Sequence, residues 1–351
     1  MAKKVRVAIL NVTGYAGVEL ARLLYQHPQA EIAAVTGRSE AGKPLGSVFP
    51  TLDDLGLTIT AELSRSAGVD FVFSALPHKA SAEALLPCLR QGLRAVDISA
   101  DFRLRDAAEY QQWYQVAHPA PELLKDAAYG LTELNKDAIR RAQVVANPGC
   151  YPTSAILALA PALKEGLIEP DIIVDSKSGV SGAGRGLGLG THFSEVNETV
   201  SAYGLEGHRH LPEIAQELRR LAPEAKLKVT FVPHLIPMTR GILSTCYAPL
   251  VESRLGSGAA SAQRELAALY RDFYRDEPFV RVVPAPPQTK QTSGSNYCVL
   301  YPAVDPRTGR LIVVSCLDNL VKGAAGQAVQ NMNVMLGFEE TMGLRGLGLW
   351  P

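Results

Sequence analysis

The sequence has few cysteines, no excess charge of either sign and no long apolar run. Its 351 residues carry 35 Lys and Arg against 35 Asp and Glu, a formal net charge of zero. A nucleic-acid or anionic-membrane binder would present a basic surface, so we expect a small neutral or anionic metabolite as partner and no nucleic acid. The longest nearly uncharged apolar stretch, residues 155–163, is far shorter than the ~20 residues of a membrane helix, which predicts no membrane span.

The five cysteines lie at positions 88, 150, 246, 298 and 316, with no C-x-x-C pair and no cluster with His at zinc-ligand spacing. This usage disfavours a disulfide framework and a structural metal site, so we predict no metal. Free thiols and an N-terminal segment without an apolar signal core predict a cytoplasmic protein. Four of the cysteines are expected to be small buried hydrophobes, whereas Cys150 lies in a poor core segment.

The first 150 residues alternate apolar segments with helical patterns. We predict strands at Val5–Leu10, Glu31–Thr36, Asp70–Leu76 and Ala95–Ser99, and helices at Gly17–Gln26 and Lys79–Gln91. Continuous hydrophobicity in such strands is typical of a parallel sheet covered on both faces. Residues 1–149 are therefore predicted to form an α/β, Rossmann-like, doubly wound parallel sheet that binds a dinucleotide.

Beyond residue 150 strands follow one another with few helices between them. A helix is predicted near Pro152–Glu165, and strands at Ile172–Ser176, Lys226–Pro233, Ile242–Leu250, Tyr297–Val304 and Leu311–Leu317. This rhythm predicts an α+β domain with a largely antiparallel sheet over residues 150–319. A last helix within residues 320–351, at Leu320–Leu336, could return to the first domain. The Gly-rich residues 178–190 fit no regular element, and their composition is that of a loop that approaches a ligand closely.

A glycine-containing turn follows the first predicted strand and leads into a helix. Such a turn places backbone N–H groups and the positive end of the helix dipole where a pyrophosphate can bind. An ordinary tight turn is the alternative, because Asn11 stands where the dinucleotide fingerprint has its first Gly. Asn tolerates a left-handed backbone, so the turn can form. The predicted cofactor contacts here are Thr13, Gly14, Tyr15, Ala16 and Gly17.

The end of the second strand indicates which dinucleotide binds. An NAD site would place Asp or Glu there for the ribose 2′-hydroxyl, whereas this strand continues into Gly37, Arg38 and Ser39. A guanidinium and a hydroxyl suit a 2′-phosphate. We therefore predict NADP(H), with Arg38 and Ser39 on the phosphate; a solvated loop arginine is the alternative.

Cys150 is the predicted nucleophile. A short strand ends in Asn147-Pro148-Gly149-Cys150-Tyr151-Pro152, and a helix follows. Pro suits the first turn of a helix, so Cys150 lies at or just before a helix N-terminus, where the dipole stabilises a thiolate. A thiolate at the carboxyl end of a sheet strand can attack a carbonyl and hold the acyl group for hydride transfer.

A thiol nucleophile needs an acid/base partner, and two of the seven histidines lie beside an Arg in the Gly-flanked segment His208-Arg209-His210. The residues alone leave both histidines open for this role. His78 ends a predicted strand and could line the nucleotide cleft. His27 and His118 are predicted to be surface residues.

Taken together, these motifs resemble the N-acetyl-gamma-glutamyl-phosphate reductase family, the NADPH-dependent enzymes of arginine biosynthesis, along essentially the whole chain. The most specific segment is Asn147–Thr153; further matches are residues 13–17, 75–78, 97–103, 178–185, 208–210, 294–296 and 318–323. The resemblance implies a Rossmann-like domain and a catalytic and oligomerisation domain, shared with aspartate-semialdehyde dehydrogenases and similar in layout to glyceraldehyde-phosphate dehydrogenase. It also implies a homo-oligomer, a dimer or a tetramer.

The resemblance assigns Cys150 as nucleophile and His208 as acid/base. It implies further cofactor contacts at Ser74, Pro77, Ser178, Gly179, Gly182 and Asn319. The substrate carries a carboxylate and a phosphate, which Arg binds well; Arg103 is the first candidate, followed by Lys177, Arg185 and Arg209. For the last three a surface charge or a salt-bridge partner is an equal alternative.

The implied reaction is reduction of N-acetyl-gamma-glutamyl phosphate to N-acetyl-glutamate 5-semialdehyde, with phosphate release, through a Cys150 thioester. One rival is the lysine-pathway reductase of N-acetyl-aminoadipyl phosphate, because one methylene is worth only ~1–3 kcal/mol of discrimination. A non-catalytic NADPH sensor would not depend on Cys150. A cysteine hydrolase is weakened by the nucleotide turn.

Overall fold

The chain forms two compact units. The computed structural model describes residues 4–64, 67–251, 256 and 258–350. The first unit comprises Met1–Gly149 with Ala324–Gly346, and the second comprises Cys150–Gly323 with Leu347–Pro351. Within the described ranges, no helix has both the length and the apolar character needed to cross a membrane.

The first unit is built on a six-stranded sheet in the order β2-β1-β3-β4-β6-β5. Every pairing in it is parallel, which confirms the predicted Rossmann-like sheet. Its strands are β1 (Val5–Leu10), β2 (Ala30–Val35), β3 (Phe71–Ser74), β4 (Arg94–Asp97), β5 (Ala128–Tyr129) and β6 (Val144–Ala146). All four residues of β3 are buried, as expected of a strand covered on both faces.

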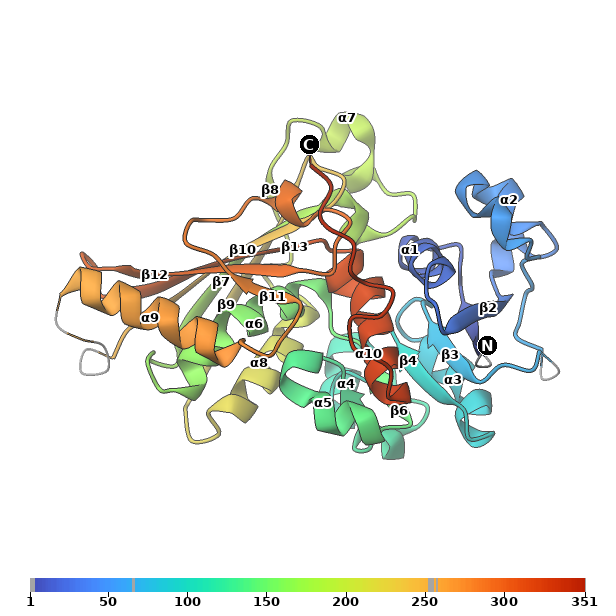
Figure 1. The fold of residues 1–351 in the computed structure, drawn as a ribbon, viewed down its shortest axis with the longest axis horizontal. Coiled ribbons are helices and arrows are strands. Elements are labelled where there is room, and N and C mark those ends of the chain that lie inside the picture. Colours follow the sequence, from blue (N-terminus) through green and yellow to red (C-terminus); the bar gives the residue numbers. More distant parts are fainter. Residues whose placement is uncertain (1–3, 65–66, 252–255, 257, 351) are drawn as a thin grey trace. The chain divides into compact units, whose positions relative to one another are not determined.

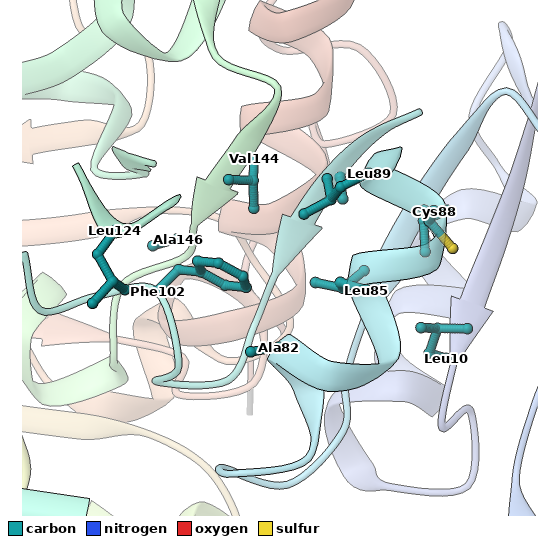
Figure 2. Close-up of a cluster of buried hydrophobic side chains, with 11 residues drawn as sticks. Leu10, Ala82, Leu85, Cys88, Leu89, Phe102, Leu124, Val144 and Ala146 are labelled. Carbon is teal, nitrogen blue, oxygen red and sulfur yellow. The ribbon is translucent and has the colours of Figure 1, made fainter. Parts of the chain in front are cut away.

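The first unit has six α-helices among the described residues. They are α1 (Tyr15–Tyr25), α2 (Leu45–Val48), α3 (Ser81–Arg90), α4 (Ala107–Tyr114), α5 (Thr132–Arg141) and α10 (Gly326–Leu336). Of these, α1, α3, α5 and α10 contact the strands of this sheet. The last of them, α10, packs against α5, α1 and β4 (Figure 1) and is part of the first unit. Figure 2 shows how α3 turns Leu85 and Leu89 toward the strands, where they join Phe102 and Val144 in one apolar cluster.

Both histidines predicted to lie at the surface, His27 and His118, are buried, so that prediction was wrong. His27 is 1% exposed, and its Nε2 lies 2.9 Å from Asn333 Oδ1. His118 is 6% exposed and packs edge-on against Tyr110 and Phe102. Burial lowers the pKa of both imidazoles. The partner of His27 lies 306 residues away in the sequence, and the ring contacts of His118 form only when the chain folds, so local pattern does not reveal either burial.

The second unit holds a seven-stranded sheet in the order β11-β12-β13-β10-β7-β9-β8. The strands are β7 (Asp171–Gly179), β8 (Ser201–Ala202), β9 (Lys228–Ile236), β10 (Ile242–Pro249), β11 (Val280–Val282), β12 (Cys298–Asp305) and β13 (Arg310–Leu317). Four pairings are antiparallel and two are parallel, β7 with β9 and β11 with β12. The largely antiparallel sheet is confirmed.

The longer helices of the second unit are α6 (Cys150–Lys164), α8 (His210–Leu221) and α9 (Ala259–Phe273); α7 (Phe193–Val196) is a single turn. Contacts join α6 to β10 and β13, and α9 to β12, and α9 lies along the sheet in Figure 1. The sequence analysis did not anticipate α9. It is tied to α6 by Tyr270 and Tyr274, whose hydroxyls donate to the carbonyls of Ala158 (2.7 Å) and Leu157 (2.6 Å).

Four fully buried serines join α6 to the sheet beneath it. Ser154 Oγ lies 2.9 Å from both Ser244 Oγ on β10 and Ser315 Oγ on β13. Ser244 continues to Ser176 on β7 at 2.7 Å. Buried hydroxyls are costly unless hydrogen-bonded. The chain of bonds therefore fixes how α6, which begins at Cys150, sits on three strands at once.

Candidate active site

Cys150 is the first residue of α6. It is partly exposed, whereas Cys88, Cys246, Cys298 and Cys316 are buried. Pro152 lies in the first turn of the helix, where a missing N–H costs nothing. A helix N-terminus directs backbone N–H groups and the positive end of the helix dipole toward its first residue, and both favour a thiolate. Cys150 thus has the exposure and the electrostatic setting of a reactive thiol.

His208 lies just before α8 on a wall of aromatic rings in the same unit. Its ring centroid is 5.9 Å from that of Tyr151, 5.5 Å from Tyr203 and 5.3 Å from Phe231. Burial, and then the charge of Arg209, lowers the pKa of His208 to about 4. The imidazole is therefore neutral at pH 7.

The backbone N–H of His210 donates to Nδ1 of His208 at 3.1 Å. A neutral imidazole that accepts at Nδ1 carries its hydrogen on Nε2. His208 is thus oriented by the next histidine along, and it presents an N–H donor from Nε2. The ring of His210 also contacts Tyr151, with centroids 5.8 Å apart.

Two tyrosines that the sequence analysis did not single out belong to this cluster. The hydroxyls of Tyr151 and Tyr203 lie 3.1 Å apart, and Tyr151 also donates to the carbonyl of His234 at 3.2 Å. Burial raises the pKa of both phenols, and the charge of Cys150 contributes to both shifts. The sulfur is therefore within electrostatic range of both hydroxyls. Tyr151 stands inside the Asn147–Pro152 motif, so the signal for it was present.

The first unit contains the turn expected to hold the dinucleotide. Asn11 adopts the left-handed backbone, φ 65°, as the sequence required of it. Its Nδ2 donates to the carbonyl of Ala75 at 2.9 Å, and Thr13 Oγ1 donates to its Oδ1 at 3.1 Å. A Cβ on Gly17 would lie 2.4 Å from the carbonyl oxygen of Asn11, so the helix packs directly on the turn. Gly14 is the N-cap of α1, Tyr15 is 40% exposed and Ala16 is half-buried.

Arg38 and Ser39 follow the end of β2 and are exposed. The guanidinium of Arg38 lies 3.8 Å from Glu62, with both side chains more than 80% exposed. Such a pair is weak, so an anionic ligand can compete for the guanidinium. Glu40, the first acidic residue after the end of β2, is paired with Lys43 at 2.6 Å.

Ser74 and Pro77 lie at the exit of β3. Pro77 is exposed, but Ser74 is fully buried and its hydroxyl lies 2.6 Å from that of Ser81. Ser81 in turn donates to Asp97 at 2.5 Å. Burial, together with the charge of Asp101, raises the pKa of Asp97 to about 6. The Ser74 hydroxyl therefore belongs to a buried polar chain that holds this edge of the sheet.

The four remaining predicted cofactor contacts come together in the second unit. Ser178 and Gly179 end β7, and Gly182 lies in a short 3-10 turn, Val180–Ala183. A Cβ on Gly182 would lie 2.9 Å from Ser178 Oγ. Asn319 accepts from the N–H of Gly241 at 2.8 Å and donates to Ser181 at 2.9 Å. The part of the Gly-rich segment next to β7 is thus packed against the protein by glycine contacts and one asparagine.

The four candidate substrate cations have different settings. Arg103 is 5% exposed and donates to the carbonyls of Asn147 (2.8 Å) and Ile98 (2.9 Å), which anchors it within the first unit. Lys177 pairs with Asp175 at 2.7 Å, and Asp175 lies 3.1 Å from His234 Nδ1. Arg185 and Arg209 are exposed.

Comparison with known proteins identifies the class. The family model of the semialdehyde dehydrogenase NAD binding domain matches residues 6–142, and that of the semialdehyde dehydrogenase dimerisation domain matches residues 150–319. Solved structures share the fold. Aspartate semialdehyde dehydrogenase II of Vibrio cholerae, complexed with ASA, superposes with a TM-score of 0.71 at 16% identity, covering 96% of this chain and 99% of that one. The Candida albicans enzyme with NADP gives 0.69 at 16%, covering 95% and 99%. The fold and the domain matches define a semialdehyde-dehydrogenase-type oxidoreductase.

Closer relatives narrow this class. A protein of Dehalococcoides mccartyi named N-acetyl-gamma-glutamyl-phosphate reductase is 55% identical over 349 residues, 99% of this chain and 100% of the relative. Those of Pelotomaculum thermopropionicum and Geobacter metallireducens, with the same name, are 53% and 52% identical, covering 99% and 98% of this chain and 99% of each relative. The chain belongs to the N-acetyl-gamma-glutamyl-phosphate reductase family.

Proposed function

We propose that this protein reduces N-acetyl-gamma-glutamyl phosphate to N-acetyl-glutamate 5-semialdehyde with NADPH, in arginine biosynthesis, through a thioester on Cys150. The observation that carries the mechanism is the position of Cys150, the one partly exposed cysteine of the five, at the first residue of α6. The substrate follows from the shared name of relatives more than 50% identical over nearly the whole chain.

The proposed chemistry starts at the Cys150 sulfur. The thiolate attacks the acyl carbon, a carbon–sulfur bond forms, and the carbon–oxygen bond to the phosphate breaks as phosphate leaves. NADPH, when bound, supplies the hydride that reduces the thioester. The carbon–sulfur bond then breaks as the hemithioacetal collapses to the semialdehyde. Covalent capture divides one difficult displacement into two easier steps.

We assign His208 as the acid/base group: its Nε2–H donates to the substrate oxygen as hydride adds to the thioester, and the negative charge passes from that oxygen to the sulfur when the carbon–sulfur bond breaks. The neutral state of His208 at pH 7 makes it a hydrogen-bond donor toward an oxygen that gains negative charge. Tyr151 and Tyr203 pack on its ring and restrict its rotation. The cluster therefore favours one orientation of the donor.

The residues of the first unit fit an NADP(H) dinucleotide. The turn after β1 ends at the N-terminus of α1, whose first turn carries no acidic side chain, so nothing there repels a pyrophosphate. Residues 13–17 would hold the pyrophosphate, and Arg38 with Ser39 would hold the 2′-phosphate. We assign Ser74, Pro77, Ser178, Gly179, Gly182 and Asn319 to the same cofactor, Ser74 and Asn319 acting by fixing the loops that they brace.

The substrate anions require fixed cations, and we assign Arg103 to them first. Its two backbone acceptors, the carbonyls of Asn147 and Ile98, hold the guanidinium in a set position, which suits bidentate recognition. Lys177, Arg185 and Arg209 are further candidates. Of these, Lys177 is already neutralised in part by Asp175.

The decisive measurement is phosphate-dependent reduction of NADP⁺ with N-acetylglutamate semialdehyde, comparing the wild type with Cys150→Ala and Cys150→Ser. Both variants should lose essentially all turnover but retain NADPH binding. Retained activity in either variant would remove the covalent mechanism. Assaying the aminoadipyl homologue in parallel measures the chain-length preference, which we expect to favour the glutamyl compound.

We further propose a homodimer formed through the second unit, which we take as the catalytic and oligomerisation domain, residues 150–319. Neighbouring strands present half-buried side chains and the exposed Ile173 on one sheet face: Tyr247 pairs in register with both Ile173 and Ile312, and Val314 with Thr245. The family model for this region is described as a dimerisation domain. Tyr247→Arg should shift the mass measured by light scattering from dimer to monomer. Five free cysteines favour a reducing compartment, so we propose the cytoplasm as its location.

A further inference from the structure

The segment that follows β13 is a tightly held turn. Asp318 is fully buried, and its side chain accepts from the backbone N–H groups of Leu320 (2.8 Å), Val321 (3.2 Å) and Gly294 (2.7 Å). Three backbone donors on one carboxylate leave the turn little freedom. The turn is therefore a fixed part of the second unit.

This turn continues into a short π-helix, Val321–Ala325. The N–H of Gly323 donates to the carbonyl of Asp318 at 2.9 Å, five residues back. π-helical turns are rare and occur frequently at functional sites. The wider π-helical turn changes which of its residues faces α6, and here that residue is Gly323.

Gly323 lies directly against the nucleophile. A Cβ built on it would be 2.7 Å from Cys150 Cβ and 3.2 Å from Cys150 Cα. Non-bonded carbon atoms prefer 3.5–4.0 Å, so any side chain at this position must displace Cys150 or the turn. The backbone of Gly323 has no positive φ. The requirement for glycine is thus one of space and not of backbone conformation.

Neither side of this contact can retreat easily. Asp318 holds the turn, and the buried bonds from Ser154 to Ser244 and Ser315 hold α6, four residues beyond Cys150. Leu317 Cδ1, 3.3 Å from the same Cβ position, closes another direction. The strain of an added methyl group would therefore fall on the position of Cys150.

We propose that Gly323, seated by the π-turn and Asp318, is a positioning residue for the reaction: its bare Cα sets where the Cys150 sulfur lies at the N-terminus of α6. The proposal rests on the proposed function for its catalytic meaning, but its physical content is the placement of a thiol. It predicts that a methyl group at position 323 impairs the nucleophile before it impairs the fold.

The test compares Gly323→Ala with a matched control, Gly46→Ala. In the control an added Cβ in α2 of the first unit meets Asp53, with Oδ1 at 1.9 Å, Cγ at 2.7 Å and Cα at 2.8 Å, so the clash is at least as close as at Gly323. The primary readout is the rate of iodoacetamide alkylation of Cys150 between pH 6 and 9, located by mass spectrometry; the other four cysteines are buried. Moving the sulfur at the helix N-terminus weakens the stabilisation of its thiolate, so we expect alkylation at pH 7 to fall severalfold. A misplacement of about 1 Å can cost on the order of 10²-fold in the enzymatic rate, so we expect kcat to fall at least tenfold. The control should stay within twofold in both.

Alkylation that stays within twofold of wild type in a folded Gly323→Ala protein overturns the proposal, whatever happens to turnover. If that variant does not fold, Asp318→Asn takes its place, because it removes an acceptor from the turn without adding an atom. We expect it to slow alkylation severalfold, and unchanged alkylation would equally overturn the proposal. Because alkylation needs neither substrate nor NADPH, a wild type that fails to reduce the acyl phosphate would refute the proposed function and leave this result standing.

Discussion

The side-chain amide of Asn11 donates to the carbonyl of Ala75 over 2.9 Å, which joins the turn after β1 to the exit of β3. In the sheet order, β1 lies between β2 and β3. The chain passes from β1 to β2 on one side and then crosses to β3 on the other side. Dinucleotides bind at such a switch point in doubly wound folds. Asn11, which stands in place of the first glycine of the fingerprint, thus holds the cofactor turn to the exit of β3.

Replacing Asn11 should separate its two roles. Asn11→Gly keeps the left-handed backbone but loses the bond to Ala75, and Asn11→Ala loses both. We expect KM for NADPH to rise about three- to tenfold in both variants, with kcat changed less than twofold. The free energy of unfolding, from urea titration, should fall by about 1 kcal/mol for Gly and about 2 kcal/mol for Ala. Equal stability of the two variants would contradict a strained backbone at this position.

Arg38 should set the preference for NADPH over NADH. Removing a charge-assisted contact to phosphate costs about 1.5–3 kcal/mol, so Arg38→Ala should raise KM for NADPH at least tenfold and leave KM for NADH unchanged. Glu62 competes for the same guanidinium, so Glu62→Gln should lower KM for NADPH about twofold. An NADPH preference that survives Arg38→Ala would mean that Arg38 is only a solvated loop residue.

The pKa of His208, about 4 in the folded protein, predicts a pH effect on stability. Its usual value is near 6.5, so the unfolded chain takes up the proton first as the pH falls, and stability is lost between pH 6.5 and 4. From pH 7 to pH 5 this amounts to about 2 kcal/mol. Urea unfolding of His208→Gln should show a shallower decline over this interval than the wild type. The buried His27 and His118 decline in both proteins and cancel in the comparison.

The same pKa predicts that activity does not fall near pH 6.5 through His208. The neutral, Nε2-protonated form is dominant above about pH 5. The acid limb of kcat/KM should therefore lie well below 6 for this group. A wild-type limb at 6.5 that disappears in His208→Gln would show that His208 titrates near its usual pKa, which would contradict this prediction.

The buried serines should be coupled energetically. Ser244→Ala removes the link between Ser154 and Ser176 and leaves their hydroxyls without that partner, which should cost about 1–3 kcal/mol of unfolding free energy. Ser47→Ala, at an exposed hydroxyl bonded to Pro44, is the control and should cost less than 0.5 kcal/mol. A double-mutant cycle of Ser154 and Ser244 should give a coupling of at least 0.5 kcal/mol, and strict additivity would argue against a connected network.

Much of the fold and part of the site could be predicted from local pattern. The buried strands of the first unit, the helix that begins at Cys150 and the left-handed Asn11 all follow from neighbouring residues, because periodicity, helix-start chemistry and backbone tolerance are local properties. The strand β7 runs to Gly179, three residues beyond the predicted end at Ser176, so the difference concerns only where the strand ends. These features are set within about ten residues.

What the sequence did not reveal depends on contacts between distant residues. Gly323 lies against Cys150 across 173 positions of sequence, and Tyr203 meets Tyr151 across 52. The burial of His27 is decided by Asn333, 306 residues away. The residues next to a glycine or a tyrosine in the sequence do not predict a contact with a residue so far along the chain. The helix α9 is an exception: its buried residues Ala262, Leu266 and Tyr270 are spaced four apart, so the helical pattern was present in the sequence and was missed.

The hydroxyl chain beneath α6 also bears on how this protein can change over evolutionary time. Packed apolar side chains can be exchanged for others of similar volume, and a helix that rests on them can shift or rotate by small amounts. Directional bonds to three different strands permit a single setting. Apart from Gly323, volume-conserving substitutions in this core can therefore accumulate without moving the sulfur, whereas a change at one serine leaves the hydroxyls of the others without a partner.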